Sequence, residues 1–138
     1  RVAKNILAEI VRGMFLNSSK HLSILEELKK HADQTYETLL QKNFEELGRQ
    51  IDKSWQLNQQ LDSGTNTPEI QQIIDRIKPW MIGQKLLGAG GGGFMLIMAK
   101  DEEAAGRIRQ ELTENPVNPR GRFLDFNISE NGFQVTKS

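Results

Sequence analysis

The chain of 138 residues contains no cysteine, so it forms no disulfide and offers no thiolate for catalysis or metal binding. A lack of cysteine suits a reducing compartment, and we expect a cytoplasmic protein. No apolar run approaches the roughly 18 residues that a membrane helix needs, and no signal-peptide pattern is present. We therefore expect no association with a membrane.

An excess of charge of either sign is also missing, because 18 Lys and Arg residues balance 18 Asp and Glu residues. Without a net positive field, the chain has no general attraction for nucleic acid or for an acidic membrane surface. The length suits one domain with a single core. The chain opens at Arg1, without methionine and inside an expected helix, so we interpret residues 1–138 as one domain of a longer protein.

Glycine, in contrast, is concentrated in one stretch, Gly88-Ala89-Gly90-Gly91-Gly92-Gly93. A Walker phosphate loop needs Lys and then Ser or Thr after the last glycine, whereas Phe94 and Met95 follow here. The apolar run from Phe94 to Met98 is typical of a buried strand, so the pattern predicts strand, glycine loop, strand. Two interpretations of the loop stay open: a tight turn, or a nest of backbone N–H groups that faces an anion.

Helical periodicity dominates the rest of the chain. We expect helices over Val2–Leu16, Lys20–Lys42, Phe44–Leu61, Thr67 to about Pro79, and Asp101 to about Thr113. The helix after Thr67 has an N-cap hydroxyl and a proline at its first position. Ile82-Gly83 is predicted to be a short turn before the hairpin.

The second and third expected helices carry apolar stripes that an antiparallel pair would bury. The stripes are Leu22, Leu25, Leu28, Ala32, Tyr36 and Leu39 in one helix, and Phe44, Leu47, Ile51 and Trp55 in the other. For Trp55 we expect a place in the core or at its edge; the alternative is an exposed surface for a partner.

Two more strands are predicted after the last helix. Phe123, Phe126 and Ile128 lie in the first, and Phe133 and Val135 alternate in the second, with Asn131-Gly132 as a hairpin signal before them. The sequence therefore predicts an α+β domain in which helices pack on a small four-stranded antiparallel sheet.

The polar residues supply no catalytic set. His21 and His31 lie ten residues apart without accompanying ligands, so we expect surface or boundary histidines and no metal site. Asp101, Glu102 and Glu103 complement a helix dipole. Arg120 and Arg122 could hold a phosphate, although a solvated strand end is favoured.

The string from Lys85 to Phe94 resembles the third conserved motif of the GHMP small-molecule kinases, a lysine, a hydrophobic residue and a G-A-G-G-G-G loop. Residues 1–7, 118–123 and 132–136 resemble the fucokinase branch, in which the kinase is joined to a guanylyltransferase. The resemblance covers essentially the whole chain and implies the C-terminal domain of that kinase.

The resemblance also implies how the parts divide. ATP, Mg²⁺ and the catalytic residues would belong mainly to an N-terminal domain absent from this chain, and this domain alone would be inactive. The glycine loop, Gly88 to Gly93 with Ala89, would support the phosphate loop and border the sugar, which would be L-fucose phosphorylated at its anomeric hydroxyl. Arg1 would lie on the substrate side. Many members have Ser, Thr or another small residue where Leu87 stands, so a hydroxyl contribution there is in doubt.

Two alternatives remain. The same domain could belong to a heptose-7-phosphate kinase or a galactokinase. In a different class of function, it could be a non-catalytic module for ligand binding or dimerisation, with the glycine loop as a plain turn.

Overall fold

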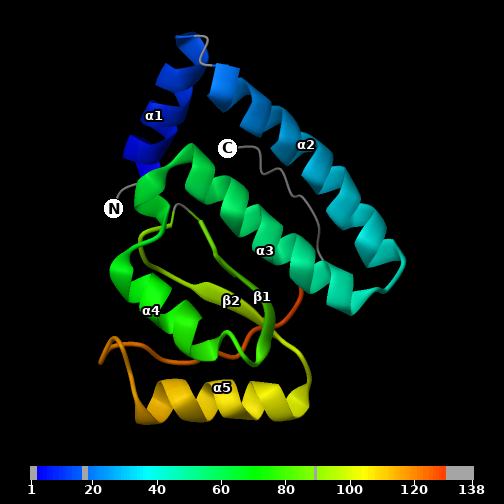
Figure 1. Ribbon diagram of the computed structural model, residues 1–138, viewed down its shortest axis with the longest axis vertical. Helices are drawn as coiled ribbons and strands as arrows, with labels where there is room; N and C mark the ends of the chain where they lie inside the picture. Colours follow the sequence, from blue (N-terminus) through cyan, green and yellow to red (C-terminus); the bar gives the residue numbers. More distant parts are fainter. Residues whose placement is uncertain (1–2, 17–18, 89, 130–138) are drawn as a thin grey trace, which may run out of the picture.

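A computed structural model describes residues 3–16, 19–88 and 90–129. The elements are α1 (Ala3–Phe15), α2 (Ser19–Leu40), α3 (Phe44–Leu61), the short 3₁₀ turn η1 (Ser63–Thr65), α4 (Pro68–Ile77), β1 (Met81–Leu86), β2 (Met95–Ala99) and α5 (Glu102–Glu114). Figure 1 shows α3 crossing the middle of the molecule, between α2 and the β1–β2 hairpin. The helix α5 lies beyond the hairpin, next to α4 and β2.

Side-chain caps fix the starts of three helices. Asn43 accepts a hydrogen bond from the N–H of Glu46 at 3.0 Å at the start of α3. Thr67 accepts from Ile70 N–H at 3.4 Å, with Pro68 at the first helical position of α4. Asp101 accepts from Ala104 N–H at 2.7 Å and begins α5. Each cap satisfies an N–H group that the helix itself cannot pair, and the starts expected at Thr67 and Asp101 are confirmed.

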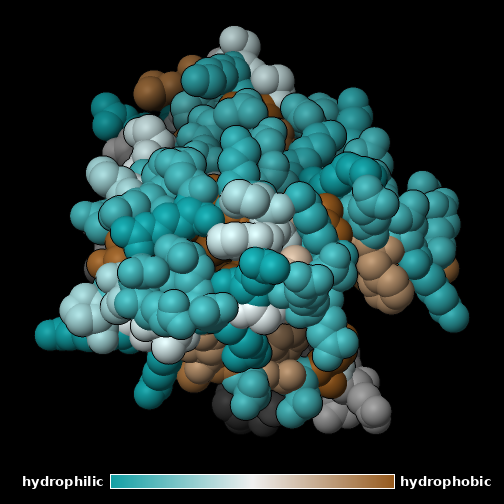
Figure 2. All heavy atoms as spheres, turned by 60° about the horizontal axis from the view of Figure 1, so that its bottom comes forward, coloured by the Kyte–Doolittle hydropathy of each residue, from teal (hydrophilic) through white to brown (hydrophobic). Residues whose placement is uncertain are grey.

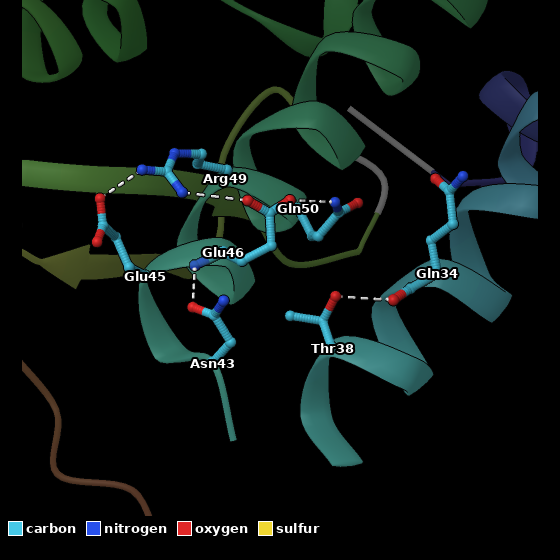
Figure 3. A network of polar contacts seen from close by, with 7 residues as sticks. All are labelled: Gln34, Thr38, Asn43, Glu45, Glu46, Arg49 and Gln50. Carbon is cyan, nitrogen blue, oxygen red and sulfur yellow. Dashed lines mark hydrogen bonds and ion pairs between the residues drawn. The ribbon is translucent and has the colours of Figure 1, made fainter. Parts of the chain in front are cut away.

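The turn between α2 and α3 carries a local polar network (Figure 3). Arg49 forms ion pairs with both Glu45 and Glu46, and Gln50 Nε2 donates to Glu46 Oε1 at 2.7 Å. The hydrogen bonds from Gln50 and Arg49 hold the pKa of Glu46 below its usual value. All of these contacts lie within four residues along α3, so they support the first turns of that helix without fixing its place in the fold.

The α2–α3 pair forms as expected, but the buried stripe of α2 was predicted wrongly. The buried residues of α2 are Ile24, His31 and Thr38, spaced by seven. The predicted Leu22, Tyr36 and Leu39 are exposed. The hydroxyl of Thr38 donates to the Gln34 carbonyl at 2.8 Å, and this bond within the helix lets a polar side chain face α3 (Figure 3).

Two other single-residue predictions have opposite outcomes. His31 was expected at the surface or a boundary, but it is buried, with 5% of its surface exposed, because it faces α3. Trp55 is buried as expected. It forms the main core cluster with Ile70 and Ile74 of α4 and Leu86 of β1. This cluster joins α3, α4 and the hairpin.

The strand β1 pairs antiparallel with β2, with Leu86 opposite Met95 at the loop end. Ile82 and Gly83 lie within β1, so the turn predicted there is wrong. The register shifts between Met81 and Gly83, as at a β-bulge. A Cβ placed on Gly83 would lie 1.9 Å from the Gly48 carbonyl oxygen of α3, so glycine is needed here for the close approach of strand and helix.

The expected four-stranded sheet is also wrong for the described residues, which form a sheet of two strands. Residues 121–129 are irregular, and Phe126 and Ile128 are 73% and 88% exposed. A strand needs a neighbouring ladder for its backbone groups, and the predicted partner around Phe133 and Val135 lies outside the described residues. The α+β class itself is confirmed. In the described part of the chain, no helix has the length and apolarity to cross a bilayer.

Candidate functional site

The glycine loop lies at the tip of the hairpin, between Leu87 and Phe94. The N–H of Leu87 donates to the Phe94 carbonyl at 2.8 Å and closes the loop. Each described glycine of the loop has a positive φ: Gly88 (85°), Gly90 (79°), Gly91 (71°), Gly92 (149°) and Gly93 (97°). Side chains other than glycine adopt such angles only with strain, so the backbone path itself requires this composition.

One side of the loop is attached to the body of the domain. We call Gly90 and Gly91 the anchored side. The N–H of Gly91 donates to the Thr65 carbonyl of η1 at 2.8 Å. Gly90 is buried, and a Cβ there would lie 2.6 Å from Thr65 Cγ2. The anchored side is therefore a packing contact, and the N–H of Gly91 is already paired.

The open side consists of Gly88, Gly92 and Gly93, which are all exposed. Among the described residues, a Cβ on Gly88 or Gly92 would meet no atom within 4 Å, and one on Gly93 would meet only the Leu87 carbonyl at 3.9 Å. A ligand group could therefore approach the main chain of the open side without displacing protein atoms. Backbone N–H groups in such a turn are suited to an anion.

The support under the loop comes from residues 62–66, for which the sequence analysis predicted no structure. Asp62 accepts from Gly64 N–H at 3.1 Å, and this cap shapes η1. Asn66 Nδ2 donates to Gln59 Oε1 at 3.0 Å and to Gln71 Oε1 at 2.7 Å, which ties the segment to α3 and α4. The Asp-Ser-Gly sequence of a capped turn was the signal available.

Lys85 belongs to the motif but turns away from the loop. Its ammonium donates to Ser54 Oγ of α3 at 2.6 Å. Burial lowers the pKa of Lys85 because desolvation penalises its charged form. The residue therefore fixes β1 to α3 below the loop, and the spacing of the motif gave no sign of this contact.

Four further residues were predicted for the site or as phosphate ligands: Arg1, Ala89, Arg120 and Arg122. Arg1 and Ala89 lie outside the described residues. Arg120 and Arg122 are exposed in the irregular segment after α5. Among the described residues, no group of three or more His, Asp or Glu side chains could hold a metal ion.

Comparisons with known proteins agree with this architecture. A family model described as GHMP kinases C terminal matches residues 4–118. A protein of Bacteroides fragilis named L-fucokinase/L-fucose-1-P guanylyltransferase is 54% identical over 138 residues, which is 100% of this chain and 14% of that protein. An Arabidopsis thaliana protein named bifunctional fucokinase/GDP-fucose pyrophosphorylase is 33% identical over 115 residues, 83% of this chain and 11% of that protein. The chain thus spans less than a sixth of either relative.

A crystal structure of L. major mevalonate kinase in complex with R-mevalonate has the same fold, with a TM-score of 0.74. The match covers 85% of this chain and 36% of that one at 18% identity, which shows a shared fold and nothing finer. Because the family model matches residues 4–118, which is most of the sequence, the chain belongs to the C-terminal domain family of the GHMP kinases.

Proposed function

We propose that this chain is the C-terminal domain of an ATP-dependent sugar kinase that phosphorylates the anomeric hydroxyl of L-fucose. The observation that carries the proposal is the 54% identity, over all 138 residues, to a protein named L-fucokinase/L-fucose-1-P guanylyltransferase. The second relative, at 33%, also carries fucokinase in its name. In the full-length polypeptide, an N-terminal kinase domain and a guanylyltransferase domain would accompany this one.

The role we assign to this domain is to place bare main chain beside the phosphate and the sugar. Phosphoryl transfer depends mainly on positioning and on dipoles aimed at developing charge. Gly88, Gly92 and Gly93 have no Cβ to keep a substrate at a distance, and the anchored side holds their loop in place. ATP and Mg²⁺ would be bound mainly by the N-terminal domain, and this chain alone would be inactive.

A substitution on the open side tests this role in the full-length enzyme. Gly92→Ala adds a methyl group where no atom of the described chain lies within 4 Å, but it strains a φ of 149° and so displaces the main chain. We expect turnover with L-fucose and ATP to fall by about 10- to 100-fold while the domain stays folded. This is less than the complete loss of a positioned donor, because the donor is displaced and not removed. Unchanged turnover by a folded variant would contradict the site.

The matched control is Gly106→Ala in α5. Gly106 is exposed, and a Cβ there also meets nothing within 4 Å, but its φ is not positive. Alanine is a better helix former than glycine, so this variant should keep full activity. Assays with galactose and heptose 7-phosphate test the substrate separately: faster turnover of either one would replace L-fucose in the proposal and leave the role of the loop intact.

A further inference from the structure

Three amide side chains from different elements meet next to the attachment point of the glycine loop. They are Gln59 of α3, Asn66 directly after η1, and Gln71 of α4. Asn66 Nδ2 donates to Gln59 Oε1 at 3.0 Å and to Gln71 Oε1 at 2.7 Å, so both of its N–H donors are used. We call these three residues the amide cluster.

The two glutamines of the amide cluster are oriented by hydrogen bonds within their own helices. Gln59 Nε2 donates to the Trp55 carbonyl at 3.4 Å, and Gln71 Nε2 donates to Asp75 Oδ1 at 2.7 Å. Because each amide nitrogen is occupied in this way, each amide oxygen is left to accept from Asn66. Position 66 therefore needs a short side chain with two N–H donors on one nitrogen, which asparagine supplies and aspartate does not.

The peptide bond that precedes Asn66 carries the attachment of the loop. Its carbonyl belongs to Thr65 and accepts from the N–H of Gly91 at 2.8 Å. Since the peptide unit is planar and rigid, a displacement of Asn66 moves this acceptor with it. The start of η1 is held separately, because the N–H of Asp62 donates to the Asn58 carbonyl of α3 at 3.1 Å. The amide cluster thus fixes the end of η1 that holds the loop.

The open side of the loop is placed through the same attachment. Gly92 follows Gly91 directly, so a shift of the anchored side is carried into the open side. A misplacement of about 1 Å can slow an enzymatic reaction by about 100-fold. We propose that Asn66 is a positioning residue for phosphoryl transfer, which sets the place of the open side through the Thr65 carbonyl. This inference rests on the proposed function of the loop.

Polarity alone does not distinguish the amide cluster from the rest of the surface. The molecule seen with its α5 end turned forward is mainly hydrophilic (Figure 2). The neighbouring helix α4 carries two exposed glutamines in succession, Gln71 and Gln72. The hydrogen bond to Asn66 is what sets Gln71 apart. The two positions therefore offer a matched comparison, in which the same amino acid is removed from adjacent places on one helix.

Steady-state kinetics of the full-length enzyme with L-fucose and ATP test the proposal. Asn66→Asp keeps the shape of the side chain but turns a carboxylate toward two amide oxygens, so the cluster should open. We expect kcat to fall by about 10-fold, whereas the KM for ATP should stay within about twofold because another domain would bind ATP. Hydrogen exchange should become faster in the peptides of residues 62–66 and of the loop, and stay unchanged in α5.

Gln71→Ala keeps the proposal testable if Asn66→Asp disturbs the wider fold. It removes one of the two hydrogen bonds at an exposed position and should lower kcat by about threefold. Gln72→Ala should leave kcat unchanged. In the double variant, Gln71→Ala should not lower the kcat of Asn66→Asp further, because the bond that it removes is already lost.

Faster exchange in the loop peptides with an unchanged kcat would overturn the positioning role, as would equal kcat values in the Gln71→Ala and Gln72→Ala variants. The proposed function is tested separately by Gly92→Ala. A loss of turnover in Gly92→Ala with full turnover in Asn66→Asp would exclude the role of Asn66 and leave the site in place. Full turnover in both would contradict the site itself and this inference with it.

Discussion

Glycine has two different tasks at the two ends of the β1–β2 hairpin. At the base, Gly83 lets β1 lie against α3, where even one methyl group would overlap the Gly48 carbonyl. At the tip, Gly88 and Gly92 have open space around them and are required for their positive φ. Gly90 combines both demands, since it has a φ of 79° and touches Thr65.

Substitutions of glycine at the two ends of the hairpin should therefore affect different properties, stability at the base and activity at the tip. A substitution at the base removes the contact that holds the hairpin on α3, so its effect should appear in folding. On the open side, a Cβ on Gly88 or Gly92 would meet no atom of the described residues within 4 Å, so the effect of a substitution there should appear in turnover. Variants at Gly83, Gly90 with Thr65, and His31 test this division, and hydrogen exchange of this domain's peptides in the full-length polypeptide measures each effect locally.

The largest effect is expected from Gly83→Ala. The added methyl group would lie 1.9 Å from a backbone oxygen, and neither backbone can yield without moving the strand away from the helix. We expect the free energy of opening of β1 and α3 to fall by about 3 kcal/mol, the upper range for overpacking. Exchange in those peptides would then be roughly 100-fold faster. Unchanged exchange would show that the base is not close-packed.

Gly90→Ala should have an intermediate effect of about 2 kcal/mol, because it combines a positive φ with a methyl group 2.6 Å from Thr65 Cγ2. The double variant with Thr65→Ser removes Cγ2 and should recover part of the loss, while the strain from φ remains. A double-mutant cycle measures that recovery. If the losses in opening free energy of Gly90→Ala and Thr65→Ser simply add in the double variant, the contact between the glycine loop and η1 does not contribute to stability.

The smallest expected effect is a pH dependence of stability that arises at His31, where α2 contacts α3. Burial lowers the pKa of His31 from 6.5, and the nearby charges of Lys53 and Lys85 lower it further. The unfolded chain therefore binds more protons than the folded one just below pH 6.5. Stability is full above that pH, falls as the pH drops from 6.5 toward the lowered pKa, and levels off below it.

His31→Gln should flatten this slope just below pH 6.5, measured by the opening free energy of α2. That window lies above the range in which Glu46 and Glu69 titrate, because the pKa of each is lowered from 4.5. An identical slope in the variant and the unchanged protein would mean that another group is responsible.

The sequence predicted the elements with local signals and missed those decided by tertiary contact. The bounds of α3 and the starts at Thr67 and Asp101 were predictable, because capping groups and periodicity act within a few residues. The buried side of α2 was not predictable in this way, because counting apolar residues favoured Leu22 and Leu39 over the face that contains Thr38. Hydrophobicity alone does not reveal a hydroxyl that is satisfied within its own helix.

The candidate site was likewise predicted where its signal is local and missed where it depends on a distant residue. Six small residues in one run predicted the loop and its unusual backbone. Neither the place of Gly83 within a strand nor the hydrogen bond between Lys85 and Ser54 was visible, since each depends on a residue of α3 that is more than 30 positions away. A two-residue pattern such as Ile82-Gly83 is equally typical of a turn and of a close approach between backbones.

The hydrogen bond from Gly91 to Thr65 has a consequence for how this protein can vary. Its acceptor is a peptide carbonyl, which every amino acid supplies, so exchange of the side chain at position 65 leaves the acceptor in place. Lengthening or shortening the stretch from 62 to 66 would instead move that carbonyl out of reach. The hydrogen bond from Gly91 thus constrains the length of the short link between α3 and α4, whatever side chain stands at position 65.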